Sequence, residues 1–236
     1  MVIKTDKAIL AVVFTTFLTF LLLFLLPIRS LGVGAIWWLY PNLLLAICWF
    51  GYLIRFQKEQ TDVDSSRLLF NSVLFGLATT ATFLPMDRLF SRHGNLQFII
   101  YRSPDFFGNI MTPVGIILTW VLFATLLIYY FHRLDMIGLH RLLASTIIGV
   151  IAAIGSIVVY RMGEDLWIWN SLRIDNMYNI LTVPIFVPIT FLLTFLLCPY
   201  YFHRQQHPLV AGMRCGLFMG VVMFLSYMIL WRSTSV

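Results

Sequence analysis

Charged residues are scarce in this chain: they make up 11% of its 236 residues, against 60% that are hydrophobic. A soluble domain typically has about 25% charged residues, so the composition predicts an integral membrane protein. The net charge of +6 comes from basic residues spread over the ends of apolar stretches, not from a basic run. We therefore expect no nucleic-acid partner and attribute the charge to membrane-flanking positions.

Cysteine, lysine and histidine are also rare, and each shortage excludes a class of membrane protein. The three cysteines are too scattered for a disulfide framework or a zinc site: Cys48, Cys198 and Cys215. No lysine falls in the last apolar stretch, which excludes a retinal Schiff base. His203 and His207 have the spacing of a metal-binding pair, but five histidines are too few for a membrane di-iron oxygenase. We expect neither a metal nor another cofactor.

Long apolar stretches are what the sequence has in abundance. They cover residues 8–27, 31–54, 68–86, 110–131, 142–160, 178–202 and 209–231. Each is about long enough to cross ~30 Å of hydrocarbon as a helix, and no alternating strand pattern is present. The sequence predicts an all-α, polytopic transmembrane bundle of about seven spans in one domain, residues 1–236. The first stretch is expected to be a retained helix, not a cleaved signal peptide. A slight excess of Lys and Arg on one side favours a cytoplasmic amino terminus, and we expect the chain to lie in the inner membrane of the cell.

A polar motif occurs twice, at residues 105–113 and 175–184. Both copies read Asp-x3-Asn-Ile-x-Thr, followed by Pro directly or after one residue, and both stand where a polar loop enters an apolar stretch. A repeat of this kind indicates two related halves of a helix bundle. If all seven stretches cross the membrane, the two loops that contain the copies emerge on the same side and face each other.

Carboxylates and aromatic rings are concentrated in those two loops, residues 87–109 and 161–177. We predict catalytic carboxyl groups among Asp87, Asp105, Glu164, Asp165 and Asp175. We predict substrate-binding side chains among Phe98, Tyr101, Trp167, Trp169, Asn109 and Asn179. The two asparagines are expected to hydrogen-bond backbone groups freed where a proline interrupts a helix. A simpler interpretation is that the acidic, basic and aromatic residues only anchor the loops at the membrane surface.

Acid catalysis on a membrane-dissolved substrate is the chemistry that this combination favours. A desolvated carboxyl group has a raised pKa and can act as an acid, and neighbouring rings stabilise a carbocation. Among the candidates Asp87 is favoured because it follows Pro85 at the end of an apolar stretch. The adjacent Arg88 argues the other way, since a cation lowers the pKa of a carboxyl group.

A family resemblance is carried by residues 85–113. Pro85-Met-Asp87 and the Pro104-Asp105 that follows it are similar to a repeat of the small integral-membrane lycopene cyclases, to which membrane carotenoid hydratases are related. Glu164-Asp165-x-Trp167 resembles a second, more degenerate copy. The Pro-x-Glu-Glu motif of that family is absent, because Pro113 is followed by Val-Gly-Ile. The resemblance implies a related fold, and an acid drawn from the loop carboxylates.

These observations lead to one expected function and two alternatives. The expected function is a membrane-embedded enzyme that modifies an isoprenoid or carotenoid taken from the bilayer, as an acid-catalysed cyclase, hydratase or isomerase. Its partners would be that lipophilic substrate and membrane lipids. The first alternative is a non-catalytic lipid-binding or assembly subunit on the same scaffold, and the second is a small transporter, which an internal repeat would suit.

Overall fold

The structure is a computed structural model of the chain, and it describes residues 6–11, 13–14, 36–59, 63–101, 112–162, 167–175, 177–202 and 207–234. The chain divides into two compact units, Met1–Phe70 and Asn71–Val236. The first unit contains α2 (Ile36–Glu59) and the beginning of α3 (Val63–Arg92). The residues discussed below as a functional site all lie in the second unit.

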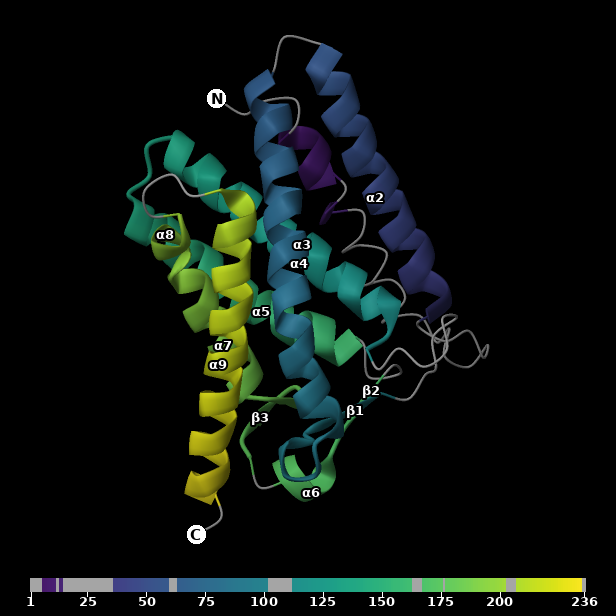
Figure 1. Ribbon diagram of the computed structural model, residues 1–236, viewed down its shortest axis with the longest axis vertical. Coiled ribbons are helices and arrows are strands. Elements are labelled where there is room, and N and C mark those ends of the chain that lie inside the picture. Colours follow the sequence, from purple (N-terminus) through teal and green to yellow (C-terminus); the bar gives the residue numbers. More distant parts are fainter. Residues whose placement is uncertain are drawn as a thin grey trace. The chain divides into compact units, whose positions relative to one another are not determined.

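Long apolar helices dominate the described residues (Figure 1). The second unit contains most of α3 and the helices α4 (Val114–Met136), α5 (Arg141–Met162), α7 (Phe186–Leu196) and α9 (Pro208–Thr234). Among the described residues, four segments are long and apolar enough to cross a membrane: Arg67–Arg92, Val114–Met136, Arg141–Arg161 and Pro208–Trp231. Two shorter apolar helices are Leu43–Arg55 and Phe186–Leu196. The all-α membrane fold expected from the sequence is therefore confirmed.

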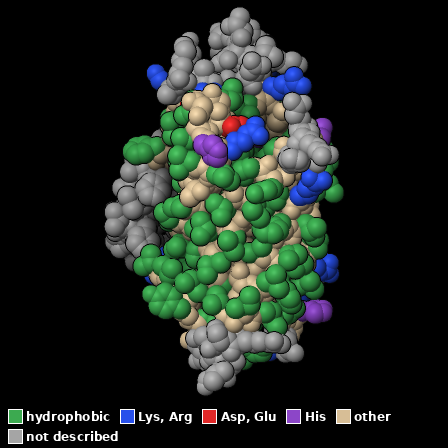
Figure 2. Space-filling model, turned by 90° about the vertical axis from the view of Figure 1, so that its left-hand side faces the viewer, with side chains coloured by type: hydrophobic (Ala, Val, Ile, Leu, Met, Phe, Trp, Pro, Cys, Tyr) green, Lys and Arg blue, Asp and Glu red, His purple; other side chains and the backbone are tan. Residues whose placement is uncertain are grey.

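The surface of these helices is suited to lipid. In Figure 2, hydrophobic side chains cover the middle of the face that is shown, and the visible acidic side chain lies near its upper end. On α9, the large apolar residues Leu217, Leu225 and Ile229 are all at least half exposed, at 60%, 50% and 66%. Such residues are stable at the surface when hydrocarbon surrounds them.

Helix α9 packs very closely on α3, and glycine makes this possible. Gly212, Gly216 and Gly220 are spaced by four residues, so they lie on one side of α9. A Cβ atom added to any of them would come closer than 3.0 Å to α3, to backbone at Gly216 and to the side chain of Met86 at Gly220. The two helices run side by side in Figure 1. The contact fixes the turn of α3 that carries the candidate site.

Two short strands join the loops that were expected to face each other. Strand β1 (Ile99–Tyr101) follows a 3-10 turn, η2 (Gly94–Leu96), and pairs antiparallel with β2 (Trp167–Trp169). The register places Ile99 opposite Trp169 and Tyr101 opposite Trp167. This β1–β2 ribbon confirms that the two long loops meet.

The stretch 178–202 is not one helix, which corrects the expected sixth span. It begins with a hairpin of β3 (Asn179–Ile180) and β4 (Val183–Pro184), continues as α7 and ends with the short α8 (Cys198–Tyr201). Leu181 and Thr182 between the strands have φ values of 51° and 72°, the left-handed backbone of a two-residue hairpin turn. Pro184 belongs to β4, and α7 begins two residues later, at Phe186.

The two motif prolines precede helices and do not interrupt them, contrary to expectation. Pro113 caps the amino end of α4, and Pro184 stands two residues before α7. Pro85, by contrast, lies well inside α3. Its missing N–H removes one backbone hydrogen bond, yet α3 continues for seven further residues to Arg92.

Candidate functional site

Asp87 lies inside α3 and is 4% exposed, which corrects its expected position in a loop. Phe83 and Phe90, one turn before and one turn after it, are buried on the same side of the helix. The neighbouring Arg88 is exposed, and Asp87 forms no ion pair with any residue that the structure describes. The concern that Arg88 neutralises Asp87 is therefore not supported by the geometry.

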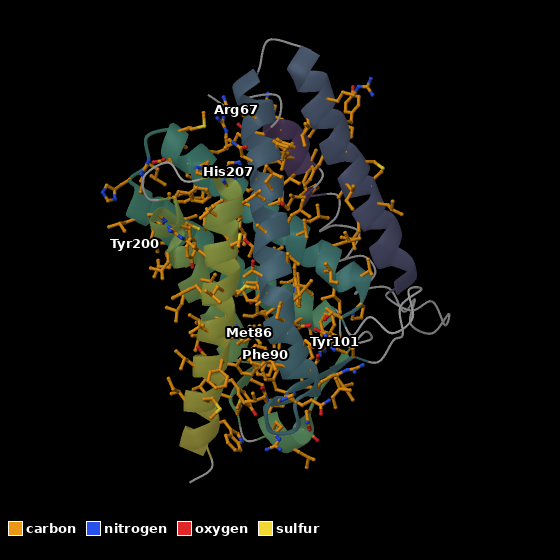
Figure 3. The ribbon with its side chains drawn as sticks, viewed as in Figure 1. Arg67, Met86, Phe90, Tyr101, Tyr200 and His207 are labelled. Atoms are coloured by element: carbon orange, nitrogen blue, oxygen red, sulfur yellow. The ribbon has the colours of Figure 1, made fainter. Side chains whose placement is uncertain are left out.

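Two hydroxyl groups hold the Asp87 carboxylate. Tyr101 in β1 donates to Oδ1 at 2.8 Å, and Thr112, just before α4, donates to Oδ2. Figure 3 shows Tyr101 at the end of α3 that also carries Met86 and Phe90. Burial, and then the negative charge of Asp87, raise the pKa of Tyr101 well above its ordinary value of 10.0. Tyr101 consequently keeps its proton and remains a donor near neutral pH.

Hydrogen bonds between the two loops keep the β1–β2 ribbon over the end of α3. The Asn170 side chain donates to the Gln97 carbonyl at 2.8 Å, and its backbone N–H donates to the Phe98 carbonyl at 2.9 Å. The backbone N–H of Phe98 in turn donates to the carbonyl of Phe90 in α3 at 3.1 Å. Tyr101 is thus positioned by backbone pairing that both loops supply.

One face of the ribbon covers the site. Side chains alternate between the faces of a strand, and residues opposite each other in a pair share a face. Tyr101, Trp167 and Trp169 therefore lie on one face. Both indole rings contact Tyr160 of α5, with ring centroids 5.4 Å away in each case, stacked for Trp169 and edge-on for Trp167.

An aromatic cluster continues from these rings into the membrane-spanning helices. Its members are Phe90, Phe98, Tyr160, Trp167, Trp169, Phe186 and Tyr227, which come from α3, the residue before β1, α5, β2, α7 and α9. Phe98 is at its centre: its ring lies 4.7 Å from Phe90, 4.8 Å from Phe186 and 5.1 Å from Tyr227. The negative faces of such rings favour a positive charge in their midst.

Three polar atoms of this cluster have no hydrogen-bond partner among the described residues. They are the indole nitrogens of Trp167 and Trp169 and the hydroxyl of Tyr227, all buried. Buried donors are nearly always paired in native proteins, so each unpaired one needs an explanation.

The two copies of the sequence motif end in matching contacts. Thr112 of the first copy donates to Asp87, which belongs to the preceding long helix, α3. Thr182 of the second copy accepts a hydrogen bond from Arg161 Nη1 at 2.9 Å, and Arg161 belongs to the preceding long helix, α5. In both copies the threonine contacts the last part of the preceding long helix, from a position just before α4 for Thr112 and from the turn between β3 and β4 for Thr182.

The structure gathers some of the residues that the sequence singled out and separates others. Asp87, Phe98, Tyr101, Trp167 and Trp169 meet at the site through the contacts above. Asp175 at the end of α6 (Ser171–Ile174) and Asn179 in β3 have exposed side chains, and no described contact links them to Asp87. Four predicted residues lie outside the described part of the chain: Asp105, Asn109, Glu164 and Asp165.

Sequence reasoning missed four contributors to the site: Thr112, Tyr160, Phe186 and Tyr227. Only Thr112 carried a signal, since the motif repeats it as Thr182. The three rings lie within or at the edge of apolar stretches, where an aromatic residue looks like ordinary core. Among the described residues no group of three or more His, Cys, Asp or Glu side chains could hold a metal ion.

Comparisons with protein-family models, with curated proteins and with solved structures give no match to this chain.

Proposed function

We propose that the chain is a membrane-embedded enzyme that transfers a proton from Asp87 to a carbon–carbon double bond of an isoprenoid. The observation that carries the proposal is a buried carboxyl group without a described cationic partner, beside an aromatic cluster, in a helix long enough to span a membrane. Carboxyl groups in such segments are costly and are commonly functional. An apolar substrate can approach such a group from the bilayer.

The chemistry needs one acid and a lining that tolerates positive charge. The proton leaves Asp87 and forms a C–H bond with electrons of the double bond, which leaves a carbocation on the substrate and a carboxylate on Asp87. The aromatic cluster stabilises that cation. Attack by another double bond followed by proton loss gives cyclisation, proton loss alone gives isomerisation, and addition of water gives hydration. Each outcome releases one proton, from the substrate in cyclisation and isomerisation and from the added water in hydration, and this proton restores Asp87.

Tyr101 and Thr112 are positioning residues in this proposal. They fix the direction of the carboxyl group by binding its two oxygens from different segments. Asp87 is also the residue that corresponds to the aspartate of the Pro-x-Asp motif in the lycopene-cyclase resemblance. Because the Pro-x-Glu-Glu carboxylates of that family are missing, the product need not be a lycopene-type ring.

A specific observation favours the non-catalytic alternative as well. Asp87 bridges α3, β1 and the start of α4, which is what a structural cross-link in a lipid-binding or assembly subunit would do. The two functions differ in what they require at position 87. A structural bridge needs a hydrogen-bonding side chain, whereas acid catalysis needs a proton that can be transferred.

The experiment that separates them uses Asp87→Asn and a matched control, Asp135→Asn. Asp135 pairs with Arg141 at the end of α4, at 3.1 Å, away from the cluster. Isoprenoid extracts of cells that express each form are compared by mass spectrometry, with membrane accumulation measured alongside. We expect the wild-type chain and Asp135→Asn to produce a changed isoprenoid, and Asp87→Asn to accumulate normally without producing it.

Two results would count against acid catalysis. An unchanged isoprenoid profile with the wild-type chain, in cells that supply varied isoprenoids, favours the assembly subunit. A changed profile that persists in Asp87→Asn shows that another group supplies the proton.

The proposal also includes a position in the inner membrane of the cell with a cytoplasmic amino terminus, which cysteine labelling at residues 60 and 136 tests.

A further inference from the structure

The unpaired indole groups of Trp167 and Trp169 point to a polar feature of the ligand. Trp167 is 4% exposed, and its indole nitrogen, like that of Trp169, is fully buried without a partner among the described residues. An indole N–H can only donate, so neither can satisfy the other. A buried donor that is left unpaired destabilises the protein, because it has lost its hydrogen bonds to water without replacement. A ligand oxygen that accepts from them would remove this cost.

The geometry brings both donors to one place. Positions 167 and 169 are two apart in β2, so their side chains lie on the same face of the ribbon. Both rings contact Tyr160, and Tyr101, the cross-strand neighbour of Trp167, reaches Asp87. The two indoles therefore lie at the same end of the aromatic cluster as the carboxyl group.

The chemistry of the donors limits the ligand to a neutral one. Two neutral N–H groups suit a hydroxyl or carbonyl oxygen, while a diphosphate or carboxylate would need charged donors to offset its desolvation. The surrounding rings require the rest of the ligand to be apolar. We infer that the site binds an isoprenoid that carries a hydroxyl or carbonyl oxygen, which accepts hydrogen bonds from Trp167 and Trp169. This inference rests on the proposed function, and it narrows the substrate class from hydrocarbons to oxygenated isoprenoids.

The test is a binding measurement on the full chain in lipid nanodiscs. The probes are tritiated geranylgeraniol and the matched hydrocarbon in which hydrogen replaces the hydroxyl group. The variants Trp167→Phe and Trp169→Phe keep an aromatic ring and remove the N–H. The control is Trp49→Phe, at an exposed tryptophan that stacks on Tyr52 in α2.

We expect the wild-type chain to bind the alcohol more tightly than the hydrocarbon. Each substitution at the site should weaken binding of the alcohol about three- to tenfold, the effect of one lost hydrogen bond. It should leave binding of the hydrocarbon unchanged, which also shows that the variant is folded. Trp49→Phe should change neither.

Two outcomes overturn the inference. If the substitutions weaken binding of both probes equally, the indoles act as apolar surface. If they weaken binding of neither probe, the indole N–H groups find another partner, such as a ring face of Tyr160.

The same measurement on Asp87→Asn separates this inference from the proposed function. Preference for the alcohol should persist in that variant whether or not Asp87 is the acid, because binding requires no proton transfer.

Discussion

Replacing Thr112 by valine tests the central contact of the site. Valine keeps the shape of threonine and removes the hydroxyl that donates to Asp87 Oδ2. The carboxyl oxygen, buried with Asp87, would lose its described donor. A buried acceptor left without its hydrogen bond costs about 1–3 kcal/mol, and a charged one costs more. We therefore expect Thr112→Val to lower the free energy of unfolding by about 2 kcal/mol or more.

Thr119→Val is the matched control on the same helix. The Thr119 hydroxyl donates to the Gly115 carbonyl at 2.7 Å, an acceptor one turn back in α4. That carbonyl keeps its ordinary helical partner when the hydroxyl is removed, so the control should cost less than about 1 kcal/mol. Both variants are compared with the wild-type chain by titration of mixed detergent micelles with sodium dodecyl sulfate, followed by tryptophan fluorescence. Equal costs for the two variants would refute the hydrogen bond between Thr112 and Asp87.

Two further predictions concern helix packing and pH. Gly216→Ala should destabilise the chain by about 1–3 kcal/mol, because the added methyl group overlaps the Thr79 carbonyl. The control Gly51→Ala has open space around the added methyl group and should be neutral or stabilising in the same unfolding assay. Burial raises the pKa of Tyr101 above 10.0, so this tyrosine ionises at a lower pH in the unfolded chain than in the folded one. The stability that the buried, protonated Tyr101 contributes is therefore complete below about pH 10 and is lost as the pH rises further. Unfolding measured at pH 9, 10 and 11 should accordingly show a smaller alkaline loss for Tyr101→Phe than for wild type; an identical loss would mean that Tyr101 is not buried beside Asp87.

The sequence predicted the fold class because that rests on composition and length. About twenty apolar residues in succession can satisfy their backbone in lipid only as a helix, and the part of the chain that the structure describes contains four such segments. It also predicted that the two loops face each other, because an even number of spans between them places both loops on the same side of the membrane. Helix ends were less predictable: α3 runs past Pro85 because a membrane helix tolerates one missing backbone bond. The hairpin turn at Leu181 and Thr182 could not be predicted from the sequence, because neither leucine nor threonine is typical of a left-handed backbone conformation.

Asp87 could be chosen from the sequence, but its surroundings could not. Its partners come from fourteen and twenty-five residues further along the chain, and only the β1–β2 ribbon brings Tyr101 to it. The close packing of α9 on α3 did have a sequence signal, the spacing of Gly212, Gly216 and Gly220. That spacing is typical of helices that approach closely in membranes.

The nature of the two donors bears on the choice between a structural bridge and an acid. Arginine, an indole or a backbone N–H can only donate, and would therefore favour a permanently ionised Asp87. Tyr101 and Thr112 contribute hydroxyl groups, which can donate to a carboxylate and, after rotation, accept from a carboxylic acid. Both protonation states of Asp87 can thus be satisfied without moving any helix. A purely structural bridge has no use for this freedom, whereas an acid that loses and regains a proton in every cycle requires it.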